Sequence, residues 1–92
     1  MTLIAPRVHL NGTSKESLTT ALYDAYKAID AARKAIVETC PHGRDYYVIG
    51  PDAYTRARNE YVERLRKLES VQAELYAIYA AVVIGRVETE EI

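Results

Sequence analysis

Residues able to bind a ligand gather in one polar segment of this sequence, between two long stretches with a helical apolar pattern. The segment reads Cys-Pro-His-Gly-Arg-Asp-Tyr-Tyr-Val-Ile-Gly-Pro-Asp and covers residues 40–52. His42 and Arg44 offer donors to a phosphate or carboxylate, and Tyr46 and Tyr47 offer flat faces on which a nucleobase can stack. The combination predicts a site for a small anionic ligand that carries a planar group.

Further basic residues are expected near this segment. Arg56 falls in the first turns of the helix predicted after residue 51, where free backbone N–H groups and the helix dipole favour an anion. Arg33 and Lys34 fall near the end of the helix predicted before the segment, so we expect them to add positive charge to the site. Phosphate would be held by Arg44 and Arg56 together with His42.

A second polar group, His9-Leu10-Asn11-Gly12-Thr13, lies near the N-terminus. It has two interpretations. It is either a turn followed by a helix cap, or His9 and Asn11 reach across to a neighbouring subunit and complete that subunit's pocket.

The polar segment also has a purely structural interpretation. Its aromatic and aliphatic residues would close the open end of a helical hairpin, with Arg44 paired to Asp45 or Asp52. Arg56 would then belong to an ordinary ladder of ion pairs, because residues 56, 60 and 64 are spaced four apart on a helix and carry alternating charge.

The sequence offers little for catalysis or metal binding. Cys40 and His42 lack the third group that orients a catalytic base, and together with His9 they are one ligand short of a zinc site. Inward Glu-x-x-His pairs, Gly-rich phosphate loops and Ser-containing elbows are absent. We therefore expect a protein that is not an enzyme and uses no cofactor and no metal.

Two long helices are predicted to position the polar segment. The first covers residues 14–40, with Thr13 as N-cap of a capping box completed by Glu16, and it ends before Pro41. Its apolar face recurs at spacings of four and three, and Ala21, Ala28 and Ala35 form a second row of small residues that would let another helix approach closely. The apolar face consists of Leu18, Leu22, Ala25, Ile29, Ala32 and Ile36.

The second helix is predicted over residues 52–84, with Pro51 in a favoured first-turn position and Gly85 as C-cap. Its apolar stripe consists of Tyr54, Ala57, Tyr61, Leu65, Leu68, Val71, Leu75, Ile78 and Val82. Residues 75–84 are apolar nearly all round, as in a helix buried on several sides. Tyr54, Tyr61, Tyr76 and Tyr79 are assigned to packing or to a subunit interface.

The predicted fold is therefore all-α: one domain, residues 1–92, built as a long antiparallel helical hairpin. An extended N-terminal arm covers residues 1–13, the polar segment forms a corner at 41–51, and an acidic tail covers 85–92. Because a two-helix hairpin cannot enclose residues 75–84 by itself, we expect homo-oligomerisation to complete the core.

Composition narrows the classes of function and the cellular settings that remain. Lys and Arg number 12 against 13 Asp and Glu, a net charge of −1 that argues against a duplex nucleic-acid binder. The single Cys40 fits a reducing cytoplasm. An N-terminus with Pro6, Arg7 and His9 is unlike a signal peptide, and the longest apolar run is too short for a membrane span. We expect a cytoplasmic protein without a membrane partner.

The strings HLNGTS (9–14), HGRDYY (42–47) and GPDA (50–53) resemble small, mostly uncharacterised bacteriophage and prophage proteins. The resemblance implies a viral setting in a host cytoplasm. By analogy with phage anti-defence sponges, the leading hypothesis is a non-enzymatic oligomer that sequesters a small anionic, nucleotide-derived immune signal. The alternative is a structural or protein-interaction adaptor of phage origin.

Overall fold

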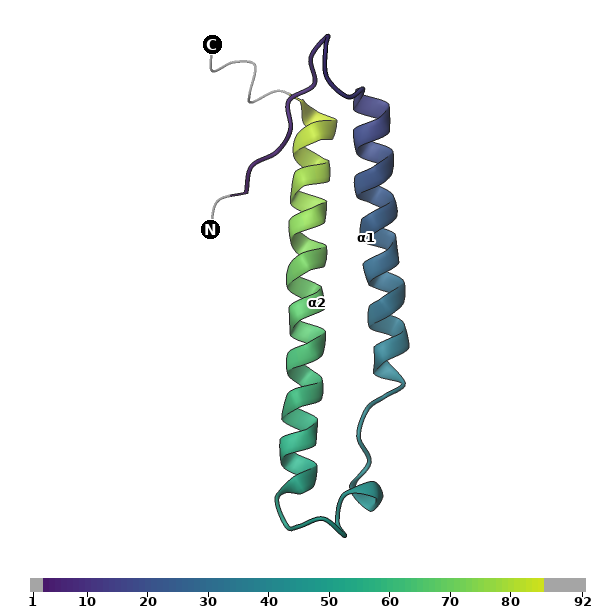
Figure 1. Ribbon diagram of the computed structural model, residues 1–92, viewed down its shortest axis with the longest axis vertical. Helices are drawn as coiled ribbons and strands as arrows, with labels where there is room; N and C mark the ends of the chain where they lie inside the picture. The colour runs from purple at the N-terminus through teal and green to yellow at the C-terminus, as the bar shows by residue number, and fades with distance from the viewer. Residues whose placement is uncertain (1–2, 86–92) are drawn as a thin grey trace.

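Two long helices lie antiparallel and side by side in the computed structural model, which describes residues 3–85 (Figure 1). Helix α1 covers Lys15–Val37, helix α2 covers Ala53–Ile84, and the short 3₁₀ helix η1, Gly43–Asp45, lies in the connection between them. The part of the chain described holds no strand. The predicted all-α helical hairpin is confirmed.

Helix α1 begins one residue later than the capping box predicted. Ser14, and not Thr13, is the N-cap: its backbone is extended, and its hydroxyl accepts a hydrogen bond of 3.1 Å from the Ser17 amide. Ser and Thr both serve as N-caps, with Ser somewhat preferred, so residue type together with the path of the arm favours Ser14.

The same helix also ends earlier than predicted, at Val37 and not at residue 40. The amides of Glu38, Thr39 and Cys40 donate to carbonyls three residues back, at 3.1, 2.8 and 3.2 Å, which is the pattern of a tightened final turn. The Thr39 hydroxyl donates to the Ile36 carbonyl at 2.7 Å and stabilises that turn. The connection between the two helices therefore spans residues 38–52.

Helix α2 agrees closely with its predicted bounds. Asp52 is its N-cap, so Pro51 lies just outside the helix and not in its first turn. Gly85 ends it in the left-handed conformation, with φ of 60°, and its amide donates to the Ala81 carbonyl at 2.9 Å. This is the predicted glycine C-cap. Apart from Gly85, the predicted acidic tail lies outside the described residues.

The seam between the helices buries few side chains. In the described range only Tyr61, Gln72 and Val82 are buried, and they are 8%, 7% and 1% exposed. Val71 is 43% exposed, so its assignment to the apolar stripe was wrong. Alternating spacings of four and three lead from Tyr61 through Gln72 to Val82, so the seam passes through Gln72 at this level.

The N-terminal arm runs beside the last turns of α2, and the chain then turns back at that end of the hairpin and enters α1 (Figure 1). The Gly12 amide donates to the His9 carbonyl at 3.1 Å, which closes the turn expected at Asn11-Gly12. The imidazole of His9 packs against Gly12, and a methyl group at that position would lie only 2.6 Å from its Nε2. Leu10, at the tip, is 95% exposed.

The molecule is a rod of 62 × 23 × 17 Å with a radius of gyration of 19.3 Å. A compact domain of this length would have a radius of gyration of about 12 Å. The rod leaves apolar side chains uncovered along its length. No helix within residues 3–85 is long and apolar enough to cross a membrane.

Val82 gives a direct test of the seam. Val82→Ala removes two methyl-sized groups from a site that is 1% exposed, and we expect it to lower the free energy of unfolding by about 1.5–2.5 kcal/mol. Val71→Ala is the matched control, since the same change at a half-exposed position should cost about 0.5 kcal/mol or less. Urea unfolding at one protein concentration measures both, and equal losses would contradict this packing.

Candidate functional site

The corner is held in shape by its own backbone. Amides of Asp45 and Tyr46 donate to the carbonyls of His42 and Gly43 at 3.0 Å each, and the Ile49 amide donates to the Tyr46 carbonyl at 2.9 Å. These successive turns fold residues 42–49 into a compact loop against the start of α2. The loop therefore presents its side chains from a defined backbone.

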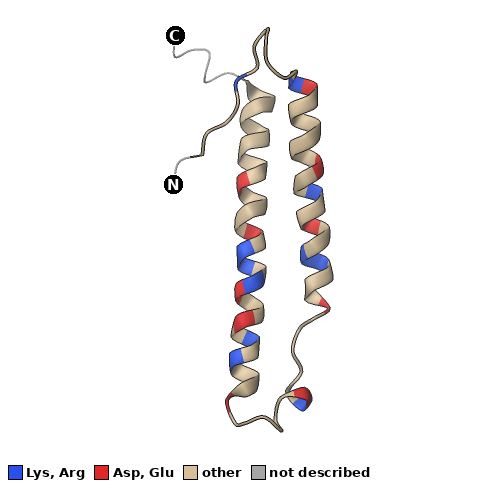
Figure 2. Ribbon diagram, viewed as in Figure 1, with Lys and Arg blue, Asp and Glu red and all other residues tan. Residues whose placement is uncertain are grey.

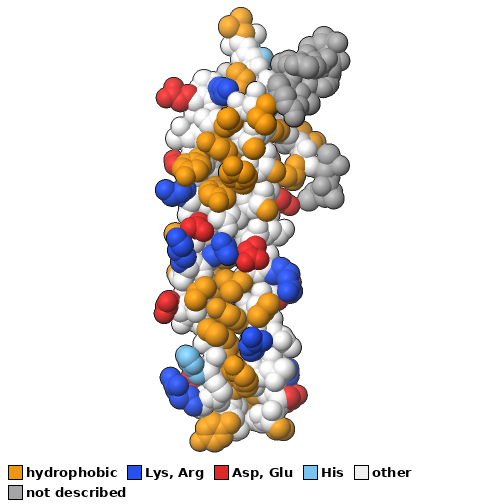
Figure 3. Space-filling model, turned by 180° about the vertical axis from the view of Figure 1, so that it is seen from behind, with side chains coloured by type: hydrophobic (Ala, Val, Ile, Leu, Met, Phe, Trp, Pro, Cys, Tyr) orange, Lys and Arg blue, Asp and Glu red, His pale blue; other side chains and the backbone are white. Residues whose placement is uncertain are grey.

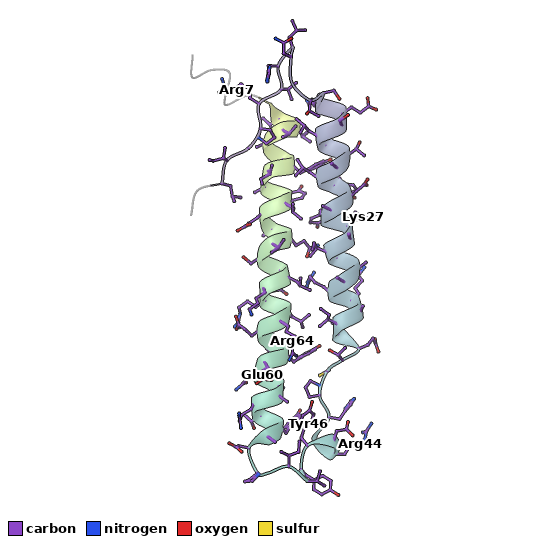
Figure 4. The ribbon with its side chains drawn as sticks, viewed as in Figure 1. Arg7, Lys27, Arg44, Tyr46, Glu60 and Arg64 are labelled. Carbon is purple, nitrogen blue, oxygen red and sulfur yellow. The ribbon has the colours of Figure 1, made fainter. Side chains whose placement is uncertain are left out.

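A shallow cavity of about 170 Å³ opens where this loop meets α2. Tyr46 and Arg56, both predicted site residues, lie on its wall. The full lining is Tyr46, Ile49, Ala53, Arg56, Ala57 and Glu60. Figure 4 shows Tyr46 between the loop and the first turns of α2, with Arg44 on the outer side of η1.

The basic residues of the corner have no acidic partner. Neither Arg44 nor Arg56 forms an ion pair with any carboxylate in residues 3–85. The ion pairs expected from the structural interpretation, from Arg44 to Asp45 or Asp52, are not formed, and Glu60 instead lies 3.9 Å from Arg64. His42 and Tyr47 are exposed beside the cavity and do not line it.

Arg33 and Lys34 do not join this site, contrary to the prediction. Arg33 reaches across the seam to Glu69 at 3.1 Å, and Lys34 lies 3.1 Å from Asp30 on its own helix. The positive charge of each of these side chains is therefore balanced by a nearby carboxylate. The segment after Val37 leads away from them, so the corner begins beyond the end of the helix that carries them.

His9 and Asn11 lie at the opposite end of the hairpin from the corner (Figure 1). In a single chain the structure brings only Tyr46 and Arg56 of the predicted site onto one cavity wall, with His42, Arg44 and Tyr47 exposed nearby. A contribution from His9 and Asn11 requires a second chain.

A belt of polar side chains, which was not predicted from the sequence, lies halfway along the hairpin. This polar belt consists of Asp30, Arg33, Lys34, Glu69 and Gln72. Gln72 accepts from Arg33 Nη1 at 3.0 Å and donates to Asp30 Oδ1 at 3.3 Å. Hydrogen bonds from Lys34 and Gln72, together with the nearby positive charges, hold the pKa of Asp30 below its usual 3.8. In the sequence, the polar belt is indicated by a glutamine that lies midway between Leu68 and Leu75 of the apolar stripe.

The belt borders an open groove of about 320 Å³. Its walls combine the belt with two aromatic rings, Tyr26 and Tyr76, and Ala73. Charged residues are concentrated from this level toward the corner, while most of α2 nearer the arm carries none (Figure 2).

Beyond the belt, toward the arm, four tyrosines form one cluster that joins both helices. Tyr23 lies against Tyr26 and Tyr79, and Tyr76 lies against Tyr26 and Tyr79, with ring centroids 5.5–5.9 Å apart. Such pairs add about 0.5–1.5 kcal/mol each beyond the area they bury. Tyr23 and Tyr76 are nevertheless 41% and 50% exposed, so close to half of each of these two side chains faces outward.

Tyr61 closes the seam near the corner. Its hydroxyl donates to the Val37 carbonyl at 3.4 Å, and burial raises its pKa, with the nearby Cys40 adding to the rise. Cys40 itself is exposed and unpaired. In residues 3–85 no three His, Cys, Asp or Glu side chains come together as a metal site.

Comparisons with known proteins found no matching family model, no matching curated protein and no matching solved structure.

The belt predicts how stability depends on pH. Because the pKa of Asp30 is lowered in the folded chain, its carboxylate stabilises the fold above about pH 4, and this contribution is lost as the pH falls through the folded-state pKa. We expect Asp30→Asn to be less stable than wild type at pH 7 and to lose less stability between pH 5 and pH 3. Urea midpoints across that range measure it.

Asp24→Asn is the control for this titration, because Asp24 lies on the same helix, is exposed, and makes no ion pair within the described residues. Its pH profile should follow that of the wild-type protein. An Asp30→Asn profile as steep as that of wild type would contradict the role given to the belt.

Proposed function

We propose that this protein is a non-enzymatic binding protein which acts as a homo-oligomer and takes a small anionic ligand with a planar group at its corner. The observation that carries the proposal is the pairing of Tyr46 and Arg56 on the wall of one cavity. An aromatic face beside a guanidinium suits a nucleobase next to its phosphate.

The electrostatics of the corner support an anionic ligand. Arg33, Arg64 and Arg66 form ion pairs with carboxylates, whereas Arg44 and Arg56 form none within residues 3–85. The first turn of α2 adds unpaired amides and a positive dipole end beside Arg56. A phosphate there would gain charge-assisted hydrogen bonds without breaking an existing ion pair. Glu60 on the same wall disfavours a second anionic group at its side of the cavity.

The more specific form of the proposal is a phage-type sponge for a nucleotide-derived immune signal. A sponge works by tight binding and by its copy number, so it needs no nucleophile and no general base. A viral setting follows from the sequence resemblance, and the ligand class follows from the arginine and tyrosine side chains at the corner.

A second candidate function is a protein-interaction adaptor, and the exposed apolar residues favour it. At the corner Tyr47, Val48 and Ile49 are 74%, 72% and 69% exposed. Along α2, Val83 and Ile84 are 41% and 55% exposed in the single chain. Contiguous apolar surface of this kind is typical of a site that another protein covers.

Native mass spectrometry with a nucleotide panel tests the leading proposal. We expect the wild-type oligomer to take up one ligand per corner from a panel of cyclic di-AMP, cyclic ADP-ribose and ADP-ribose, with inorganic phosphate as the bare-anion probe. Arg44→Ala and Arg56→Ala should each weaken uptake about 10- to 100-fold, since a hydrogen bond to a charged group is worth about 1.5–3 kcal/mol.

Arg66→Ala is the matched control, because it removes the same charge from α2 at a residue that pairs with Glu63 and does not line the cavity. It should leave uptake within about twofold of wild type. If wild-type protein binds none of the panel and keeps its oligomeric mass, the sponge proposal fails and the adaptor becomes the better account.

A further inference from the structure

We propose that a second copy of this chain covers one face of the hairpin in antiparallel orientation, so that the arm end of each copy lies level with the corner end of the other. The face, called the tyrosine face below, is defined by residues seven apart on each helix, which share one side. Its members are Tyr23, Asp30 and Val37 of α1 and Val62, Glu69, Tyr76 and Val83 of α2.

The face is apolar on both sides of an acidic residue on each helix, with Tyr23 and Tyr76 toward the arm and Val37 and Val62 toward the corner. On α1 an acidic residue lies between Tyr23 and Val37, and on α2 Glu69 lies between Val62 and Tyr76. Figure 3 shows the result: two groups of hydrophobic side chains along the rod, separated by a band of charged ones. A two-fold axis through that band lays each apolar group of one copy on an apolar group of the other.

The charges of the band are self-complementary. Asp30 and Glu69 carry two negative charges, and Arg33 and Lys34 carry two positive ones, so the band is neutral. In a two-fold dimer the same patch meets itself, which is favourable only when it carries both signs. The tyrosine face satisfies that condition at its centre, where the axis would pass.

The face is also large enough. Helix α1 has 23 residues and is therefore about 35 Å long, and the rod is 23 Å wide. The product is about 800 Å², which is the area that each partner buries in a standard stable interface. The uncovered halves of Tyr23 and Tyr76 would supply the aromatic anchors that such interfaces favour.

Side-chain size selects the antiparallel orientation. Pairing the copies head to head would set Tyr23 and Tyr76 of one copy against the same two rings of the other and leave the valines facing valines across a gap. Pairing them antiparallel sets the protruding rings of one copy over Val37 and Val62 of the other, so that large residues face small ones and fill the space. Val37 is 49% exposed and free to receive a ring.

The same pairing aligns the two ends. Lys15, where α1 begins, lies 18 residues or about 27 Å from Arg33. Ala53, where α2 begins, lies 16 residues or about 24 Å from Glu69 in the other direction. Rotation about the band therefore brings the arm turn of one copy to the level of the corner of the other. The corner cavity stays uncovered in this pairing, because Arg56 on its wall lies about 160° around α2 from Tyr76.

A distance between two labels tests the orientation without any ligand. In a Cys40→Ser background, Ser17→Cys carries a nitroxide at an exposed site 16 residues from Arg33. The antiparallel dimer should give a label separation of about 48 Å by pulsed electron paramagnetic resonance, since each label lies about 24 Å from the axis. A separation below about 30 Å would mean the parallel arrangement, and no dipolar signal would mean a monomer. Either result overturns the proposal.

Glutamate substitutions on two different sides of α2 test which face forms the dimer interface. Tyr76→Glu should weaken dimerisation at least 10-fold in sedimentation, because it buries a carboxylate in the interface. Val71→Glu is the control: Val71 is similarly exposed, at 43% against 50%, and lies about 140° around the helix from Tyr76. Circular dichroism confirms that both variants remain helical. Equal effects on dimerisation, or a larger effect of Val71→Glu, would overturn the choice of face.

Discussion

A single seam between two helices is the constraint on which the rest of this structure depends. Each helix meets only one neighbour, so a side chain is enclosed only when it points directly into the seam. Tyr61, Gln72 and Val82 do so, and residues one position away are at least partly exposed. The exposed alanine row of α1, the open tyrosine cluster and the half-exposed valines all follow from this geometry. A chain of this shape gains most of its further stability by adding a second layer of helices.

The polar belt is the one place where the seam is specified by hydrogen bonds and not by apolar packing. Gln72 is buried and is matched by Arg33 and Asp30, so sliding α2 along α1 would leave a buried amide without partners. The belt thereby fixes the offset of the two helices. That offset places the arm turn and the corner at similar distances on either side of the belt, which gives the rod the approximate two-fold character used above.

Ligand binding and helix association are compatible in this molecule because they use different groups. The corner offers Arg44 and Arg56, which have no ion-pair partner among residues 3–85, while the tyrosine face offers aromatic surface and a neutral charged band. An antiparallel pair built on the tyrosine face would leave the corner cavity open, because the cavity lies on the opposite side of α2. A sponge and an adaptor would share the same dimer and differ in what the corner touches.

The sequence by itself determined the features that depend on nearest neighbours along the chain. The spacing of apolar residues predicted both helices, Gly85 predicted the end of α2, and Asn11-Gly12 predicted the turn of the arm, because each is a local preference of the backbone. Tertiary structure decided which of Thr13 and Ser14 caps α1, which of Val71 and Gln72 enters the seam, and where Arg33 and Lys34 find their partners. Those outcomes depend on the offset between two helices distant in sequence. No local pattern records that offset, so the corner site was predicted with two cations that belong to the belt.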